Sequence, residues 1–366
     1  MPRFTAHGLH AATKLIVTAM GSNGPEVEEV ADHLVRANLA GHDSHGVGML
    51  PAYVRLLQAG LLVPNQTPET VLDAGALLVI DARRGYGQRM TGNAVRAAIA
   101  HARAHGACIL AFRNSAHIGR IGTYGEMAAR AGMAFIGYVN VSDHHDVQAP
   151  FGCGQPRLGT NPFCTAVPGP DGNPVLLDMA TTTIAAGKAR VAHNKGVAVP
   201  PGALIDAEGQ PTTDPTPFIR DHIGALLSFG GHKGSGLAVM CEIMAGAVAG
   251  GQRAGEPEKG GILNSMLAVV IDLARLGDPA AIARAVGETT AHIRSARPAP
   301  GVSAILLPGE PERRAAAERM DQGITIDPQS WADITEAAGK LGLSAAALEA
   351  AASSNATGWV PGRLAE

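Results

Sequence analysis

The chain has 366 residues, 46% hydrophobic and 17% charged, so it should bury a sizeable core in one large or two ordinary domains. Its formal net charge of −3 provides no basic field for nucleic acid or an anionic membrane. No apolar run is long and uncharged enough to span a bilayer, and the N-terminus does not resemble a signal peptide. The four cysteines form no Cys-x-x-Cys pair, which favours reduced thiols. We therefore expect a cytoplasmic protein that binds neither nucleic acid nor membranes.

Helices are expected at the N-terminus. Apolar residues at helical spacing predict one over residues 7–20 and another from Pro25 to about Gly41. Proline at the first helical position and acidic residues in the first turn favour the second helix start. A third helix is expected over residues 51–59.

Two imidazoles, a carboxylate and a hydroxyl follow the second helix, in Gly41-His42-Asp43-Ser44-His45-Gly46-Val47-Gly48. The glycines allow a tight turn, and His45 can exchange a proton near neutral pH. Ser44 and Asp43 could orient that imidazole, and the C-terminal end of the helix favours its protonated form. The alternative is a polar turn that only caps the helix, and the residues of this segment do not exclude it.

The middle of the chain alternates strands and helices, which predicts an α/β protein with helical ends around a strand-rich centre. Residues 195–217 should form an irregular surface segment. We expect strands at 71–81 around Gly75, and at 108–112, 135–141, 164–168, 175–178, 266–273 and 302–307. We expect helices at 90–105, 123–131, 185–192, 236–249, 279–292, 328–341 and 344–352.

A second unusual segment, Arg113–Gly122, lies between a predicted strand and a predicted helix. Backbone N–H groups in such a connection can face an anion. The segment is neither a Gly-x-Gly-x-x-Gly fingerprint nor a P-loop.

Six segments in order resemble the malate/L-lactate/ureidoglycolate/sulfolactate dehydrogenase family and cover nearly the whole chain. They are residues 41–48, 114–122, 159–162, 177–181, 231–236 and 309–312. The resemblance implies NAD(P)-linked oxidoreduction of 2-hydroxy and 2-oxo acids, or of imino acids, by a homodimer with a non-Rossmann, sulfolactate-dehydrogenase-like α/β fold. It implies a mixed-sheet domain over 75–314 that binds NAD or NADP. A helical domain, 1–74 plus 315–366, would carry the histidine motif.

The resemblance assigns proton transfer to His45, which is the acid in reduction and the base in oxidation. A proton is needed because negative charge grows on the substrate oxygen as the hydride arrives. Ser44 is implied as the relay partner, and Asp178 as the carboxylate that completes the relay and favours the protonated imidazole. His117 is the competing candidate for catalysis. Asp178 could also be a simple turn residue at a strand end.

Several loops are implied to hold the cofactor. Lys233, among glycines, suits a pyrophosphate, although a solvated helix start is the plain alternative. Glu310 could accept hydrogen bonds from ribose hydroxyls or stabilise a helix start. The implied cofactor-binding residues are His117, Ile118, Gly119, Ser142, Thr160, Asn161, Asp178, Met179, Ala180, Thr181, His232, Lys233, Gly234, Gly309 and Glu310.

The substrate is expected beside His45, Met49, Tyr53 and Thr160. Many relatives carry at the position of Met49 an arginine that pairs with the substrate carboxylate, so Arg55 or a residue from elsewhere would have to substitute. This departure leaves the individual hydroxy, oxo or cyclic imino acid open. A metal-dependent hydrolase using the histidines and aspartates of 42–45 and 143–146 is the alternative from another class. Their spacing fits no metal motif, and no metal is expected.

Overall fold

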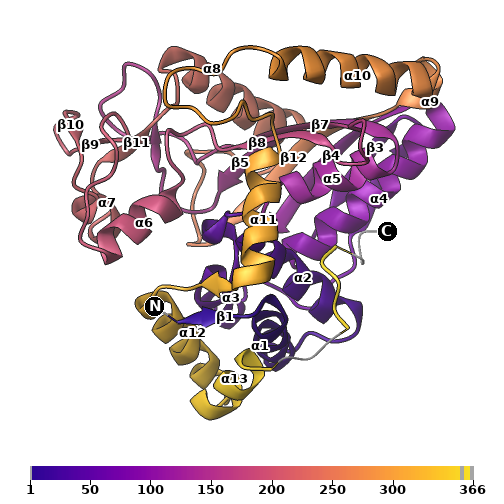
Figure 1. Cartoon of the computed structure of the whole chain (residues 1–366). Coiled ribbons are helices and arrows are strands. Elements are labelled where there is room, and N and C mark those ends of the chain that lie inside the picture. Colours follow the sequence, from indigo (N-terminus) through magenta and orange to yellow (C-terminus); the bar gives the residue numbers. More distant parts are fainter. Residues whose placement is uncertain (1, 355–357, 363–366) are drawn as a thin grey trace.

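The computed structural model describes residues 2–354 and 358–362, and a seven-stranded sheet forms its centre (Figure 1). The strand order is β2-β3-β4-β12-β5-β7-β8. The β3–β4 pair is parallel and the other five pairs are antiparallel, so this sheet is not the doubly wound parallel sheet of a Rossmann fold. The strands are β2 (Glu69–Ala74), β3 (Leu77–Asp81), β4 (Ala107–Ala116), β5 (Met133–Ser142), β7 (Phe163–Val167), β8 (Val175–Met179) and β12 (Leu263–Asp272).

Helices cover both faces of this sheet. α4 (Gly87–His105) and α5 (Gly122–Arg130) pack on the face that presents Phe112 and Phe135, and together they form the main hydrophobic core. Side chains alternate between the faces of a sheet, so Asn140 of β5 points the other way. There it contacts the helical segment formed by α8 (His232–Cys241) and the π-helix η3 (Glu242–Val248). Two helices follow β12 along the top of Figure 1, α9 (Leu273–Leu276) and α10 (Pro279–Arg294).

The two ends of the chain build one helical layer, which lies below the sheet in Figure 1. β1 pairs with β13, and α1 approaches α13 so closely that a Cβ on Gly8 would lie 2.0 Å from the Ala352 carbonyl oxygen. The elements of this part are β1 (Arg3–Phe4), α1 (Ala6–Ala19), α2 (Pro25–Leu39), η1 (Asp43–His45), η2 (Val47–Met49), α3 (Leu50–Gln58), α11 (Glu310–Gln322), β13 (Ile324–Thr325), α12 (Pro328–Lys340) and α13 (Ala345–Ala352).

A smaller four-stranded sheet with the order β10-β9-β11-β6 lies beside the main sheet. α6 (Ala186–Asn194) and α7 (Thr216–Arg220) pack on it around a separate core that includes Leu204, Phe218 and Leu226. Its strands are β6 (Gln148–Ala149), β9 (Leu204–Ile205), β10 (Pro211–Thr212) and β11 (Ala225–Leu227).

The structure corrects two of the predicted elements. The apolar run 302–307 forms no strand, because its side chains are largely exposed and Glu310 accepts the hydrogen bond of the Leu307 N–H. Residues 195–217 are not wholly irregular, since they contain β9 and β10, and Leu204 and Ile205 are buried.

The division into residues 75–314 and 1–74 plus 315–366 stays a prediction. Of that division, residues 1, 355–357 and 363–366 lie outside the described residues. Throughout residues 2–354 and 358–362, the helices are too short or too polar to cross a membrane.

Candidate functional site

The histidine motif forms two successive 3-10 turns, η1 and η2, directly after α2. Asn38 at the end of α2 holds them: its amide nitrogen donates to Asp43 (2.7 Å) and its amide oxygen accepts from the Val47 N–H (2.8 Å). Arg319 of α11 also pairs with the Asp43 carboxylate. Asp43 therefore shapes the turn, and Ser44 is the motif residue that contacts the imidazole.

His45 forms a hydrogen-bonded pair with its neighbour and lies against a second imidazole. Its Nδ1 is 2.8 Å from Ser44 Oγ, and its ring stacks on the ring of His117 with the centroids 5.5 Å apart. The predicted partner Ser44 is thus in place. The structure also brings together the two histidines that competed for the catalytic role.

A chain of buried groups orients His117. The Gln88 amide N–H donates to the Tyr53 hydroxyl (2.6 Å), and this hydroxyl lies 2.8 Å from His117 Nδ1. With the Tyr53 oxygen accepting from Gln88, its own proton is available to His117 Nδ1, and this arrangement leaves the imidazole proton on Nε2. His117 is therefore arranged as a neutral hydrogen-bond donor. The sequence does not single out Gln88, because only its place after Gly87 in a glycine-bearing turn marks it.

Burial keeps both imidazoles neutral. It lowers the pKa of His45 to about 4, with further lowering by His42 and Arg120 and an opposing effect of Asp178. It lowers the pKa of His117 to about 3, helped by His45 and His144. The carboxylate predicted to favour the protonated imidazole acts in that direction, but the loss of hydration outweighs it.

Asp178 lies at the end of β8, where its carboxylate contacts Gly122 and Arg120 and not Ser44, the partner expected for a proton relay. Its carboxylate accepts from the Gly122 N–H (2.9 Å) and lies 3.3 Å from Arg120 Nε. Arg120 also pairs with Glu126 (2.7 Å). Among the hydrogen bonds of residues 2–354 and 358–362, none joins Asp178 to Ser44, so the predicted relay is not formed here. Asp178 is nevertheless near enough to His45 to raise its pKa.

Hydrogen bonds join the segments around Thr160, Thr181 and Phe229, which belong to or adjoin three of the predicted cofactor loops. The Thr181 N–H and hydroxyl both donate to the Thr160 carbonyl, and the Thr181 carbonyl accepts from the Phe229 N–H (3.1 Å). Thr182 forms a β-bridge with Ser228. Met179 and Ala180 thereby lie between Asp178 and the segment that leads to the glycine-rich start of α8.

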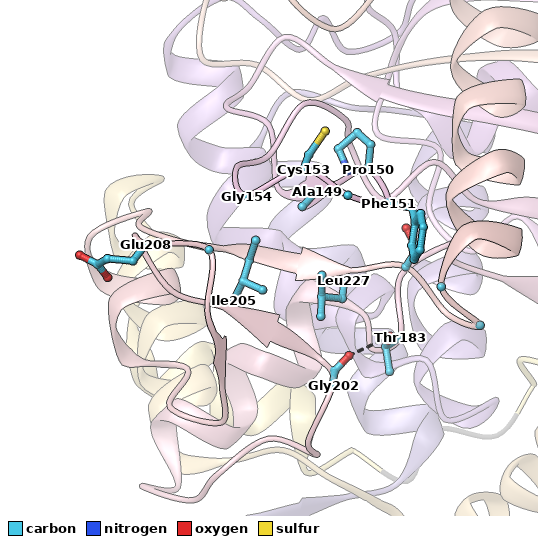
Figure 2. A pocket seen from close by; sticks show the side chains of 15 residues that line it. Ala149, Pro150, Phe151, Cys153, Gly154, Thr183, Gly202, Ile205, Glu208 and Leu227 are labelled. Atoms are coloured by element: carbon cyan, nitrogen blue, oxygen red, sulfur yellow. Dashed lines mark hydrogen bonds between the residues drawn. The ribbon is translucent and has the colours of Figure 1, made fainter.

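A cavity of about 680 Å³ opens beside these loops (Figure 2). That volume is ordinary for a small-molecule site. Gly230 and Gly231 line it with positive φ angles of 57° and 63°, and the exposed side chains of His232 and Lys233 follow directly. The lining residues are Ala149, Pro150, Phe151, Gly152, Cys153, Gly154, Thr183, Gly202, Ile205, Glu208, Gly209, Leu227, Ser228, Gly230 and Gly231.

Two buried hydroxyls near these loops lack a partner within the described part of the chain: Ser142 Oγ at the end of β5, and Thr182 Oγ1. A buried hydroxyl without a hydrogen bond is costly, so such groups are candidates for ligand contacts. Gly234 is buried, and a Cβ there would lie 2.2 Å from the Phe229 carbonyl oxygen, so its role is to let α8 start close to the loop.

Other predicted cofactor residues are already engaged in the fold. The Asn161 amide nitrogen donates to Glu242 (2.8 Å), and its oxygen accepts from the Val141 N–H. Ile118 is buried and its N–H donates to Asn264, while Gly119 has a φ of +73° beside the buried His33. These residues position the loops, and their side chains offer little to a ligand.

Gly309 lies against Leu176 of β8, two residues before Asp178, where a Cβ on the glycine would be 3.4 Å from Leu176 Cβ. Glu310 pairs with Arg294 and accepts from the Leu307 N–H (2.8 Å), in a separate cavity of about 140 Å³. Met49, expected near the substrate, packs against the helical core. Tyr53 is buried and reaches the site through its hydroxyl.

The sequence profile described as Malate/L-lactate dehydrogenase matches residues 4–335. The chain belongs to this family. Relatives include hydroxycarboxylate dehydrogenase B of Escherichia coli, 44% identical over 352 residues that cover 95% of this chain and 97% of that protein. The L-lactate dehydrogenase of Cupriavidus necator is 40% identical over 321 residues, which cover 87% and 91% of the two chains. The predicted family and the predicted enzyme class, a dehydrogenase, are thus confirmed.

Solved structures of the malate/L-lactate dehydrogenase family confirm the fold. A malate/lactate dehydrogenase structure from E. coli has a TM-score of 0.91 at 41% identity and covers 96% of this chain and 98% of its own. The sulfolactate dehydrogenase of Methanocaldococcus jannaschii has a TM-score of 0.83 at 31% identity, covering 95% and 99%. The predicted non-Rossmann, sulfolactate-dehydrogenase-like α/β fold is therefore correct.

Proposed function

We propose that this dehydrogenase transfers a hydride between a nicotinamide cofactor, NAD or NADP, and C2 of a small 2-hydroxy acid or its 2-oxo partner. The observation that carries the proposal is the Ser44–His45 pair, whose imidazole stacks on the ring of His117 and feels the charge of the Asp178 carboxylate. Two relatives are named for hydroxycarboxylates and L-lactate, which supports this substrate class.

The larger cavity and its edges fit a dinucleotide. Glycines 230 and 231 let a ligand approach the backbone, and the Ser142 and Thr182 hydroxyls are buried without partners. Lys233 stands at the start of α8, where an ammonium and helix N–H groups together suit a pyrophosphate. When bound, the nicotinamide supplies or accepts the hydride.

The protein's own part in the reaction is proton transfer and orientation. In oxidation, neutral His45 takes the hydroxyl proton when Ser44 accepts from its Nδ1–H, because Nε2 then carries the lone pair. In reduction the protonated imidazole returns that proton, and Asp178 favours this charged form. His117 donates its Nε2–H to the substrate oxygen and so stabilises the charge that develops there.

We also propose that the protein is a homodimer. The helical segment α8–η3 presents an exposed apolar stripe that comprises Val239, Met240, Ile243 and Val248, with exposed fractions of 38%, 45%, 44% and 60%. An apolar stripe of this kind on an otherwise ordinary surface supports association with a second copy. It adjoins the start of α8, so the partner would lie near the proposed cofactor site.

The test is a screen of 2-oxo acids and cyclic imino acids with NADH and with NADPH, followed by the loss of cofactor absorbance. We expect turnover of at least one 2-oxo acid, and its loss in His45→Ala with cofactor affinity retained. Turnover of imino acids alone would instead favour the reductase activity for which a Pseudomonas putida relative, 30% identical, is named. Hydrolysis that requires added metal, without any use of NADH or NADPH, would refute the proposal.

A further inference from the structure

The proposed substrate brings a carboxylate into a half-buried site beside His45 and His117, where it loses part of its hydration. An unpaired carboxylate in such a place is strongly disfavoured, so a cation of the protein has to meet it. The cation must lie close to the turn that carries His45, since the carboxyl carbon is bonded to the reacting C2. This inference rests on the proposed function and names the group that recognises the acid.

Most guanidinium groups around this turn are already engaged. Arg319 pairs with Asp43, and Arg120 pairs with Glu126 and Asp178. Arg55, which the sequence offered as a substitute for the missing arginine at position 49, donates to the Gly260 carbonyl (3.1 Å) at an exposed position. Arg84 is bound to Asp143 (3.3 Å). Using any of these for a substrate would break an interaction that holds the fold.

Arg190 is different. It lies on α6, one helical turn after Gly187, and a Cβ on Gly187 would lie 2.2 Å from Ser44 Cβ. Residues three apart share a helix face, so Arg190 projects from the face that packs on the His45 turn. Its Nη2 is 3.7 Å from the position that a Cβ on Gly48 would occupy.

The Arg190 guanidinium is also uncommitted. The side chain is half-buried, and throughout residues 2–354 and 358–362 no hydrogen bond or ion pair engages it. The pKa of the nearby Asp327 carboxyl, the N-cap of α12, is lowered against the effect of burial, chiefly by hydrogen bonds from Ser330 and least by the charge of Arg190. A planar guanidinium held at the edge of the site can bind a carboxylate with two parallel hydrogen bonds.

We infer that Arg190 binds the substrate carboxylate and thereby selects 2-oxo and 2-hydroxy acids over their uncharged analogues. The cation comes from α6, which packs on the smaller sheet, and its guanidinium lies beside Gly48, the residue before Met49. Position 49 can then be apolar, and its methionine packs against the helical core.

The test compares the best 2-oxo acid substrate with its methyl ester, which keeps the reacting carbonyl but has no charge. In Arg190→Met we expect kcat/KM for the acid to fall roughly ten- to hundredfold, mainly through KM, as for the loss of a charge-assisted hydrogen bond. In the same variant, kcat/KM for the methyl ester should change by less than about threefold. For Arg190→Lys we expect a kcat/KM for the acid between those of the wild type and Arg190→Met, because lysine keeps the positive charge but cannot form two parallel hydrogen bonds.

Lys195→Met is the matched control, since this exposed lysine at the C-cap of α6 removes the same charge away from the site. Oxamate binding measured by calorimetry with NADH present gives a second readout: it should weaken in Arg190→Met and stay unchanged in Lys195→Met. An unchanged acid-to-ester ratio in Arg190→Met, or an equal loss for both substrates, overturns the inference. If the unaltered protein reduces no 2-oxo acid at all, the proposed function itself has failed.

Discussion

At His45, two influences on one proton oppose each other. The imidazole loses hydration inside the protein, which disfavours its charged form, and the Asp178 carboxylate favours that form. The loss of hydration is the larger effect, so His45 is mostly neutral. It can therefore accept a proton readily, but only a small fraction of the molecules has a proton on His45 to donate. The two directions of the reaction should therefore respond differently to pH.

We predict that kcat/KM for 2-oxo acid reduction falls about tenfold per pH unit between pH 6 and 8. The reason is that the protonated fraction of His45 drops tenfold per unit above its pKa of about 4. Over the same range, kcat/KM for 2-hydroxy acid oxidation should be nearly flat, because the base is already neutral. Stopped-flow or steady-state rates in constant-ionic-strength buffers measure both.

Asp178→Asn provides the comparison for this pH profile. Removing the carboxylate should lower the His45 pKa further, so reduction should slow at every pH in the range while keeping the same slope. A reduction rate that stays flat from pH 6 to 8 would show that His45 is not the proton donor.

Local sequence could predict the Ser44–His45 pair, because the two residues are adjacent and their hydroxyl and imidazole meet within one turn. It could not predict Gln88 and Tyr53 as supports of His117, because these three residues come from different parts of the chain. The link from Asp178 to Ser44, implied by resemblance, is absent from the described structure, where Arg120 and the Gly122 N–H engage that carboxylate.

At the scale of elements, the close packing of α6 on the histidine turn depends on Gly187, which has no side chain. Gly187 lets the helix approach so closely that a Cβ there would lie 2.2 Å from Ser44 Cβ, which is well inside van der Waals contact. Any larger residue must push α6 and η1 apart.

We predict that Gly187→Ala lowers kcat by at least about tenfold, since small displacements of catalytic groups are costly. Far-UV circular dichroism and the melting temperature should change little, because α6 can retreat as a unit. Gly339→Ala is the control: this glycine of α12 has open space around its Cβ position, and alanine there should stabilise the protein by about 0.5–1 kcal/mol. Wild-type kcat in Gly187→Ala would contradict the close packing of α6.

Periodicity predicted the long elements well because each buries one continuous face, as α4 does against Phe112. It failed for 302–307, where an apolar run like that of a strand lies largely exposed and the Leu307 N–H bonds to Glu310. It also missed the two-residue strands β9 and β10, which are too short for any pattern: β9 pairs with β11, and β10 pairs with β9.

At the scale of the whole molecule, the proposed dimer can be tested by placing charges in the exposed apolar stripe on α8–η3. We predict that Met240→Glu together with Ile243→Glu yields a monomer by size-exclusion chromatography with light scattering, because the charges cannot be buried against a second copy. Activity should fall with dissociation. Ile293→Glu on α10 is equally exposed, at 45%, and serves as a control that should leave the mass unchanged. A double variant that keeps the wild-type mass would rule out this face as the interface.

The pairing of the two chain ends also constrains how the protein can be made. Arg3 pairs with Thr325, so the layer that carries His45 closes only after nearly the entire polypeptide has been synthesised. During translation, α1 and α2 must wait for partners that are still inside the ribosome, with their apolar faces uncovered. Such contacts between distant residues slow folding. The newborn chain therefore has a long interval in which the central sheet can already be assembled while the histidine turn still lacks Arg319 of α11, and chaperones that shield apolar helices would act in that interval.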